Sequence, residues 1–157
     1  MSADELVHLV NQYQAGLEAE LVLLRQLEQV AARQRESTEA HDFAHLAIAG
    51  DERDRVTRSL LAIEQGLAEV RKTMQASQAE VMALEGFQAV LALRQQAAEL
   101  VAHILATDRE SLKSLADAEL ARRAALASLE RGDTTLAAYR KVLAPPVSSA
   151  ALLNRRG

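Results

Sequence analysis

Apolar residues recur with helical spacing from the beginning of the chain. Steps of four and three residues join Leu6, Val10, Tyr13, Leu17, Leu24, Leu27 and Ala31, with Glu20 as the one polar member. Such a heptad seam is the packing stripe of a long helix. Ser2 and Glu5 form the S-x-x-E capping box that begins helices. We therefore expect a helix over Ser2–Glu36, about 50 Å long at about 1.5 Å per residue.

The chain then becomes polar over residues 37–42, where serine, threonine and aspartate are all residue types that begin helices. We expect a short turn of helix at Phe43–Ala49. Gly50 and Asp51 would end that turn or bend it.

A second heptad seam follows and predicts a helix over about Asp51–Leu84. Its members are Val56, Leu60, Ile63, Leu67, Val70, Met74, Val81 and Leu84. Only Ser77 interrupts it. Gly66 lies within the pattern, where glycine costs about 1 kcal/mol relative to alanine, and we interpret it as a position of close approach between helices.

A third long helix is expected over about Phe87–Arg131, after a turn at Gly86. Its stripe includes Leu91, Ala98, Val101, Leu105, Leu112, Leu115, Leu126 and Leu129. The stripe slips near Asp108 and again near Glu119. This helix is therefore expected to bend or to change its packing partner.

The closing segment has a different character, with a stop and restart at Gly132 and Asp133. A short amphipathic helix is expected over Thr134–Leu143, ended by the two prolines at positions 145 and 146. Isolated helices shorter than about 12–15 residues are marginal, so this piece must dock on its own bundle or on a partner. The predicted partner-binding residues are Leu136, Tyr139, Val142 and Leu143, extended by Leu152 and Leu153.

These patterns predict an all-α protein, an elongated antiparallel bundle of three long helices with short extra helices and coiled-coil-like seams. The expected organisation is a helical bundle domain over residues 1–144 and a flexible C-terminal tail over residues 145–157. No period-2 pattern indicates a strand.

Composition narrows the functional classes. The 157 residues include 18 basic and 22 acidic ones, a net charge of −4, with the signs interleaved along the chain. Two Phe, two Tyr and no Trp leave few surfaces for base stacking, so we expect no nucleic-acid binding. There is no cysteine for disulfides or thiolate metal sites. No apolar run approaches the roughly 20 residues that cross a bilayer, and the acidic opening is unlike a signal peptide, so we expect a cytoplasmic location without membrane insertion.

Catalytic and metal signals are weak. His41 and His45 would share a helix face and could hold a metal, but HxxxH lacks the glutamate beside the first histidine that marks a zinc protease helix. Glu5 and His8 supply only one of the two Glu-x-x-His pairs of a di-iron bundle. There is no phosphate-binding glycine loop and no nucleophile elbow. We expect no enzyme activity, no cofactor and no metal site.

The layout resembles the FlgN-type family of flagellar export chaperones. The resemblance is carried by the first helix, LVHLVNQYQAGLEAELVLLRQLEQVAARQRES, by the connector HDFAHLAIAGDERDRVTRSLLAIEQGL, and by the ending LASLERGDTTLAAYRKV. Within the connector, Asp42, Leu46, Arg53, Leu60 and Leu61 stand at the expected kinds of position. The ending RKVLAPPVSSAALLNRRG departs from the Tyr-Asp-x-x-Gly-like stretch frequent in the family.

The resemblance implies a cytoplasmic chaperone for hook-associated (junction) proteins in flagellum biogenesis. Such a chaperone binds the amphipathic terminal helices of these subunits with its C-terminal region and keeps them competent for type III protein export. Tyr139 is the residue onto which a contact with the export gate would map. The implied state is a monomer or weak homo-oligomer. A structural coiled-coil scaffold acting through helix–helix assembly and a metal-binding helical bundle are the alternative functions.

Overall fold

The computed structural model describes residues 1–130, and these residues form four helices and no strand. The helices are α1 (Ala3–Glu39), α2 (Phe43–Ala76), α3 (Gln78–Met82) and α4 (Phe87–Glu130). The all-α class is therefore confirmed for this part of the chain. The expected helix over Thr134–Leu143 and the tail after it lie outside the described residues.

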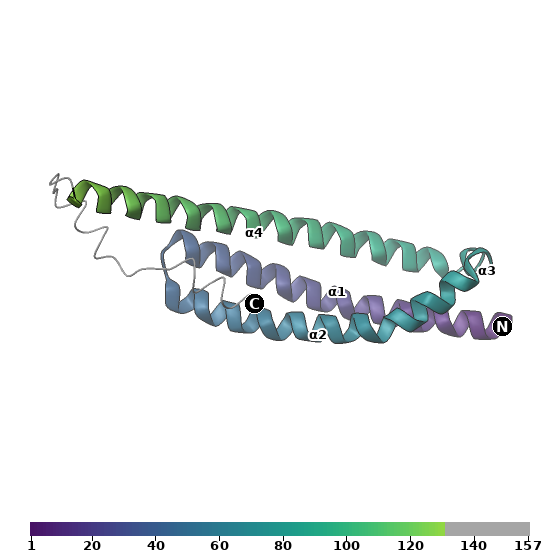
Figure 1. Cartoon of the computed structure of the whole chain (residues 1–157). Helices are drawn as coiled ribbons and strands as arrows, with labels where there is room; N and C mark the ends of the chain where they lie inside the picture. The colour runs from purple at the N-terminus through teal and green to yellow at the C-terminus, as the bar shows by residue number, and fades with distance from the viewer. Residues whose placement is uncertain (131–157) are drawn as a thin grey trace.

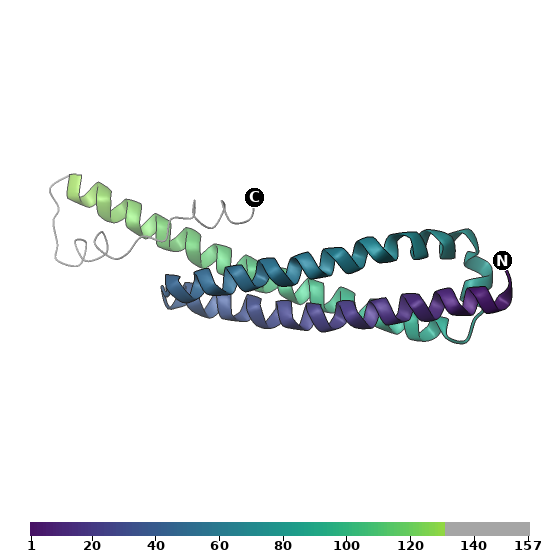
Figure 2. The same ribbon diagram turned by 90° about the horizontal axis from the view of Figure 1, so that it is seen from below.

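The three long helices are arranged around α1 (Figure 1). α1 and α2 form an antiparallel hairpin, and α4 runs in the same direction as α1. Both α2 and α4 pack extensively against α1, which makes α1 the helix that they share. In Figure 2, α4 crosses the hairpin obliquely, and its C-terminal part continues beyond the α1–α2 turn.

The seam predicted for α1 is confirmed at every position. Its seven apolar members and Glu20 are all buried. The capping box is also present, because the Glu5 amide donates to Ser2 Oγ at 3.2 Å and the Ser2 amide donates to Glu5 Oε2 at 3.0 Å.

α1 ends at Glu39, three residues beyond the predicted Glu36. Thr38, expected among helix-start residues, instead lies buried in the last turn, where its hydroxyl donates to the Gln34 carbonyl at 2.7 Å. The chain then reverses at His41, whose φ of 54° is in the left-handed region. Asp42 caps α2 by accepting a hydrogen bond from the His45 amide at 3.2 Å.

Of the two possibilities at Gly50 and Asp51, a break is wrong, because α2 is one helix from Phe43 to Ala76. Leu46 and Ala49 are buried before Gly50 and Val56 after it, so the packed face continues through the glycine. Burial of this face outweighs the cost of about 1 kcal/mol for a helical glycine.

The helix break occurs at Ser77 instead, the residue that interrupts the predicted seam. Its backbone leaves the helical region at φ −119° and ψ 35°. The expected helix over Asp51–Leu84 is thus divided into the end of α2 and the short α3. The turn before Phe87 contains Gly86, as predicted.

The predicted close approach at Gly66 is also wrong. A Cβ atom added there would have no neighbour within 4 Å. The close approach is at Gly16 of α1, where an added Cβ would lie 2.5 Å from Leu67 Cδ2. Gly16 therefore allows the buried Leu67 of α2 to pack directly on the backbone of α1.

The core is divided into two clusters along α1. The first joins the N-terminal half of α1 to the second half of α2, α3 and the start of α4, through Leu6, Val10, Tyr13, Leu17, Leu67, Val70, Met74, Val81 and Val90. The second joins Leu24, Leu27, Ala31, Val56 and Ile104. Glu20 occupies the seam position between Leu17 and Leu24, where the two clusters meet.

The first five members of the stripe predicted for α4 do not face the core, whereas Leu115, Leu126 and Leu129 are half-buried. Leu91, Ala98, Val101, Leu105 and Leu112 are exposed. The side of α4 that packs on α1 consists of Val90, Leu93, Ala97, Leu100, Ile104, Thr107 and Ser111. The prediction failed because this inner side includes an alanine, a threonine and a serine, whereas the outer side carries more leucine.

Candidate functional site

The residues predicted to bind a partner lie outside the described part of the chain. Leu136, Tyr139, Val142, Leu143, Leu152 and Leu153 all follow residue 130. Their role as a binding stripe stays a prediction, and the site can be built only from the helices before them.

The most prominent apolar surface is the exposed side of α4, which we call the outer seam. It comprises Leu91, Ala98, Val101, Leu105 and Leu112. Leu91, Ala98, Leu105 and Leu112 follow one another at intervals of seven residues, and Val101 falls between them. The four larger residues keep 41–53% of their surface exposed. The described helices therefore leave a regular helix-packing stripe uncovered.

The outer seam lies on the side of α4 that is nearer to α2. Asp108 is three residues after Leu105 and four before Leu112, so all three share one face of the helix. Arg53 of α2 forms a bidentate ion pair with Asp108, with both N–O distances 2.7 Å. The seam is thus bordered by the polar contact that joins α2 to α4.

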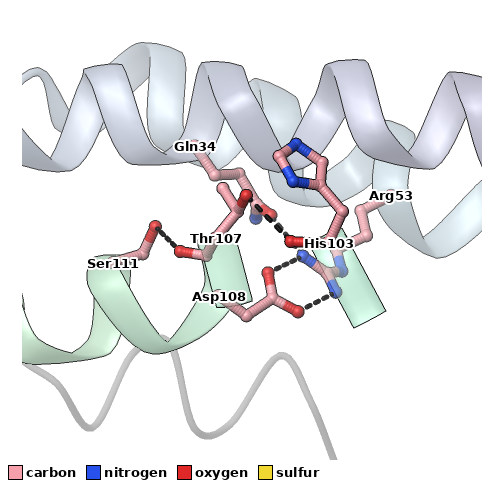
Figure 3. A network of polar contacts seen from close by, with 6 residues as sticks. All are labelled: Gln34, Arg53, His103, Thr107, Asp108 and Ser111. Carbon is pink, nitrogen blue, oxygen red and sulfur yellow. Dashed lines mark hydrogen bonds and ion pairs between the residues drawn. The ribbon is translucent and has the colours of Figure 1, made fainter. Parts of the chain in front are cut away.

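Arg53 connects all three long helices (Figure 3). In addition to Asp108, its Nη1 donates to Gln34 Oε1 of α1 at 2.8 Å. The Arg53 and Asp108 side chains are 21% and 15% exposed, so solvent screens the pair only partly.

The inner side of α4 next to this ion pair is polar, and its hydroxyl groups are satisfied within the helix. The Thr107 hydroxyl donates to the His103 carbonyl at 3.1 Å, and the Ser111 hydroxyl donates to the Thr107 carbonyl at 3.2 Å. Neither hydroxyl group needs a partner on α1, so burial of these two side chains costs little free energy.

A second polar cluster joins α1 to α2 at the boundary between the two cores. Arg71 donates to Glu64 Oε1 at 2.5 Å and to the Tyr13 hydroxyl at 3.4 Å. Its guanidinium carbon lies 5.9 Å from the centroid of the Tyr13 ring. Glu20 lies beside Glu64 and Arg71. Among the described residues, the buried Oε1 atom of Glu20 has no hydrogen-bond partner.

The environment of Glu20 changes its protonation. Burial, followed by a hydrogen bond with Glu64 and repulsion from it, raises the pKa of Glu20 to about 7, and Arg71 opposes the rise. The pKa of Glu64 is lowered, chiefly by the hydrogen bond from Glu20 and then by Arg71. The two carboxyl groups therefore share one proton below neutral pH.

His41 and His45 do not form the helical pair that a metal site would need. His41 precedes α2 and adopts a left-handed backbone, so the i, i+4 relation on one helix is lost. His45 Nδ1 lies 2.6 Å from Asp42 Oδ2. Within residues 1–130, no cluster of three His, Cys, Asp or Glu side chains has the arrangement to hold a metal ion.

The sequence signal for the two polar clusters was incomplete. Glu20 stood out as the polar member of an apolar seam, but nothing in the spacing indicated Glu64 or Arg71 as its neighbours. The slip near Asp108, which predicts a bend or a change of packing partner, lies at the position where Arg53 binds.

None of the helices over residues 1–130 is both long enough and apolar enough to span a membrane.

Comparisons with known proteins identify no relative. No family model matches the chain, and neither the curated proteins nor the solved structures contain a match.

Proposed function

We propose that this protein is a cytoplasmic export chaperone that binds the amphipathic terminal helices of flagellar hook-associated (junction) subunits and keeps them competent for type III export. The family resemblance of the sequence supplies the identity of the subunits. One structural observation supports helix binding: the longest described helix, α4, exposes a heptad-spaced apolar seam. Burying it against a partner helix yields about 25 cal/mol per Å² before ordering costs, without nucleotide or metal.

The same proposal includes the arrangement of the three long helices as an elongated antiparallel bundle. A slender antiparallel bundle with coiled-coil-like seams suits this task, because narrow seams leave one side of a helix available for a further helix. The closing residues from Leu136 to Leu153 would then extend the binding surface beyond α4, and Tyr139 would be available for the export gate.

The experiment is a binding titration of the full chain against purified junction subunits, by isothermal titration calorimetry. A stoichiometric complex that is lost when the subunits' terminal helices are removed is the expected result. If the subunits with intact terminal helices show no binding, the proposal is refuted. A chain truncated after Arg131 that binds fully would remove the closing residues from the site.

A coiled-coil scaffold is the second candidate, because a seam with a period of seven residues also suits a second copy of the same helix. Size-exclusion chromatography with light scattering separates the two functions. The chaperone is expected to be a monomer or a weak oligomer, whereas a scaffold forms a stable, defined oligomer through its long helices.

A further inference from the structure

We infer that the outer seam of α4 is the docking surface for a partner helix of about 20 residues with acidic flanks. This inference rests on the proposed helix-binding function and adds the surface and the chemistry of the partner. The seam extends from Leu91 to Leu112, which is about 32 Å at about 1.5 Å per residue. Its spacing of seven residues matches the periodicity of another helix rather than of an extended peptide.

The charges on the seam determine the choice of partner. Arg94 lies three residues after Leu91, and Arg109 lies four after Leu105, so both are on the apolar face. Lys113 is four residues after Arg109. All three are exposed, and none forms an ion pair with a described residue. Asp108, the acid on this face, is already neutralised by Arg53.

Two other possible occupants of the outer seam, the closing segment of this chain and a second copy of α4, match its charges less well. Residues 131–157 carry five basic side chains and one acidic side chain, so like charges would meet if this segment lay on Arg94 and Arg109. A second α4 would place the same arginines against each other in a symmetric pair. An acidic partner helix satisfies both the apolar and the charged positions.

The probe is a pair of synthetic 21-residue helical peptides with leucine at heptad positions a and d. One carries glutamate at the flanking e and g positions, and the other carries lysine there. Residues 1–130 hold 13 basic and 21 acidic residues, so net charge alone would favour the lysine peptide. Preference of the full chain for the glutamate peptide, by at least about tenfold in Kd, therefore reports on the seam itself.

Two variants of the full chain locate the site. Leu105→Ser with Leu112→Ser removes apolar area, and Arg94→Glu with Arg109→Glu reverses the charge. Each variant is expected to raise the Kd for the glutamate peptide at least about tenfold. Its melting temperature is expected to stay near that of the parent, because all four side chains are exposed. The matched control is Leu61→Ser, an exposed leucine of α2 with 56% of its surface accessible, and its binding is expected to be unchanged.

Several outcomes would overturn the inference. These are equal binding of both peptides, unchanged binding by the two seam variants, or a dimer of the parent chain that the seam variants dissociate. A tenfold gain in peptide binding on removal of residues 132–157 would assign the seam to that segment.

If the glutamate peptide binds at the seam but no junction subunit binds, the proposed flagellar function is refuted and the docking surface is supported. If the subunits bind and the seam variants have no effect, the function stands and the docking surface fails.

Discussion

Glu20 is an ionisable residue at a position where the heptad repeat of α1 places a core residue. Its side chain is 8% exposed, and Glu64, Arg71 and Tyr13 are the titratable groups around it. A buried carboxyl group next to a second carboxylate stays protonated more easily than one in water. The stability of the α1–α2 pair is therefore coupled to pH.

We predict that the free energy of unfolding falls as the pH rises from about 4.5 to about 7. The native-state pKa of Glu20 is about 7, against an ordinary value of 4.5, so in this range the native state keeps a proton that the unfolded state releases. The stability contributed by this proton is full below 4.5 and lost by pH 7. The loss is at most about 3 kcal/mol. Urea denaturation at several pH values measures it.

The Glu20→Gln variant provides the matched test, because glutamine keeps the shape and cannot ionise. Its stability is expected to be nearly independent of pH between 4.5 and 7 and to exceed that of the parent at pH 8. Glu18→Gln, an exposed position on the same helix, is expected to keep the parental pH dependence. A Glu20→Gln variant with the parental slope would show that another group causes it.

Two of the helical glycines, Gly16 and Gly66, have opposite expected responses to alanine. Gly66→Ala is expected to stabilise the protein by about 0.5–1 kcal/mol, since helix propensity improves and no atom lies within 4 Å of the new methyl group. Gly16→Ala is expected to destabilise it, because the methyl group would overlap the buried Leu67. Chemical denaturation of both variants measures the difference, and a stabilising Gly16→Ala would contradict the packing described for α1 and α2.

At the scale of the elements, the register of α4 determines which of its two apolar faces supports the fold. Val90 is fully buried, whereas Leu105 is 53% exposed. Val90→Ala is expected to cost about 1–2 kcal/mol of unfolding free energy, and Leu105→Ala less than about 0.5 kcal/mol, although leucine loses more atoms. Urea denaturation ranks the two variants. The reverse order would mean that α4 packs through the outer seam.

The Arg53–Asp108 pair determines how α2 and α4 are held beside each other. Asp108→Asn removes one charge and one of the paired hydrogen bonds, leaves Arg53 partly buried, and is expected to cost about 1–3 kcal/mol. A double-mutant cycle with Arg53→Met measures the coupling between the two residues. Arg33 and Glu52 form a control pair that is more exposed, with an N–O distance of 2.9 Å, for which the coupling is expected to be weaker because solvent screens it.

At the scale of the whole molecule, the described residues contain two core clusters along α1, and α4 extends past the hairpin (Figures 1 and 2). If the closing segment is a partner-binding site, as the sequence predicts, truncation after Arg131 is expected to leave the melting temperature nearly unchanged, as followed by far-UV circular dichroism. If the closing residues contribute to the core, the truncated chain would melt several degrees lower.

Much of the helical structure could be predicted from the sequence. The α1 seam, the capping box at Ser2 and the turn at Gly86 were all correct. These features depend on residues that are close together in the sequence, so they can be predicted from the spacing of residue types alone.

Tertiary packing decided the rest. The register of α4 could not be predicted, because both of its faces carry helix-spaced apolar residues and only the position of α1 selects between them. The helix continues through Gly50 because Leu46, Ala49 and Val56 are buried together, and the close approach at Gly16 exists because Leu67 of another helix fills it. Glu20 was visible as an exception in the seam, but its raised pKa depends on Glu64 and on burial. Local spacing determines the helices of this protein, whereas contacts between residues distant in the chain determine which faces pack and which acid keeps its proton.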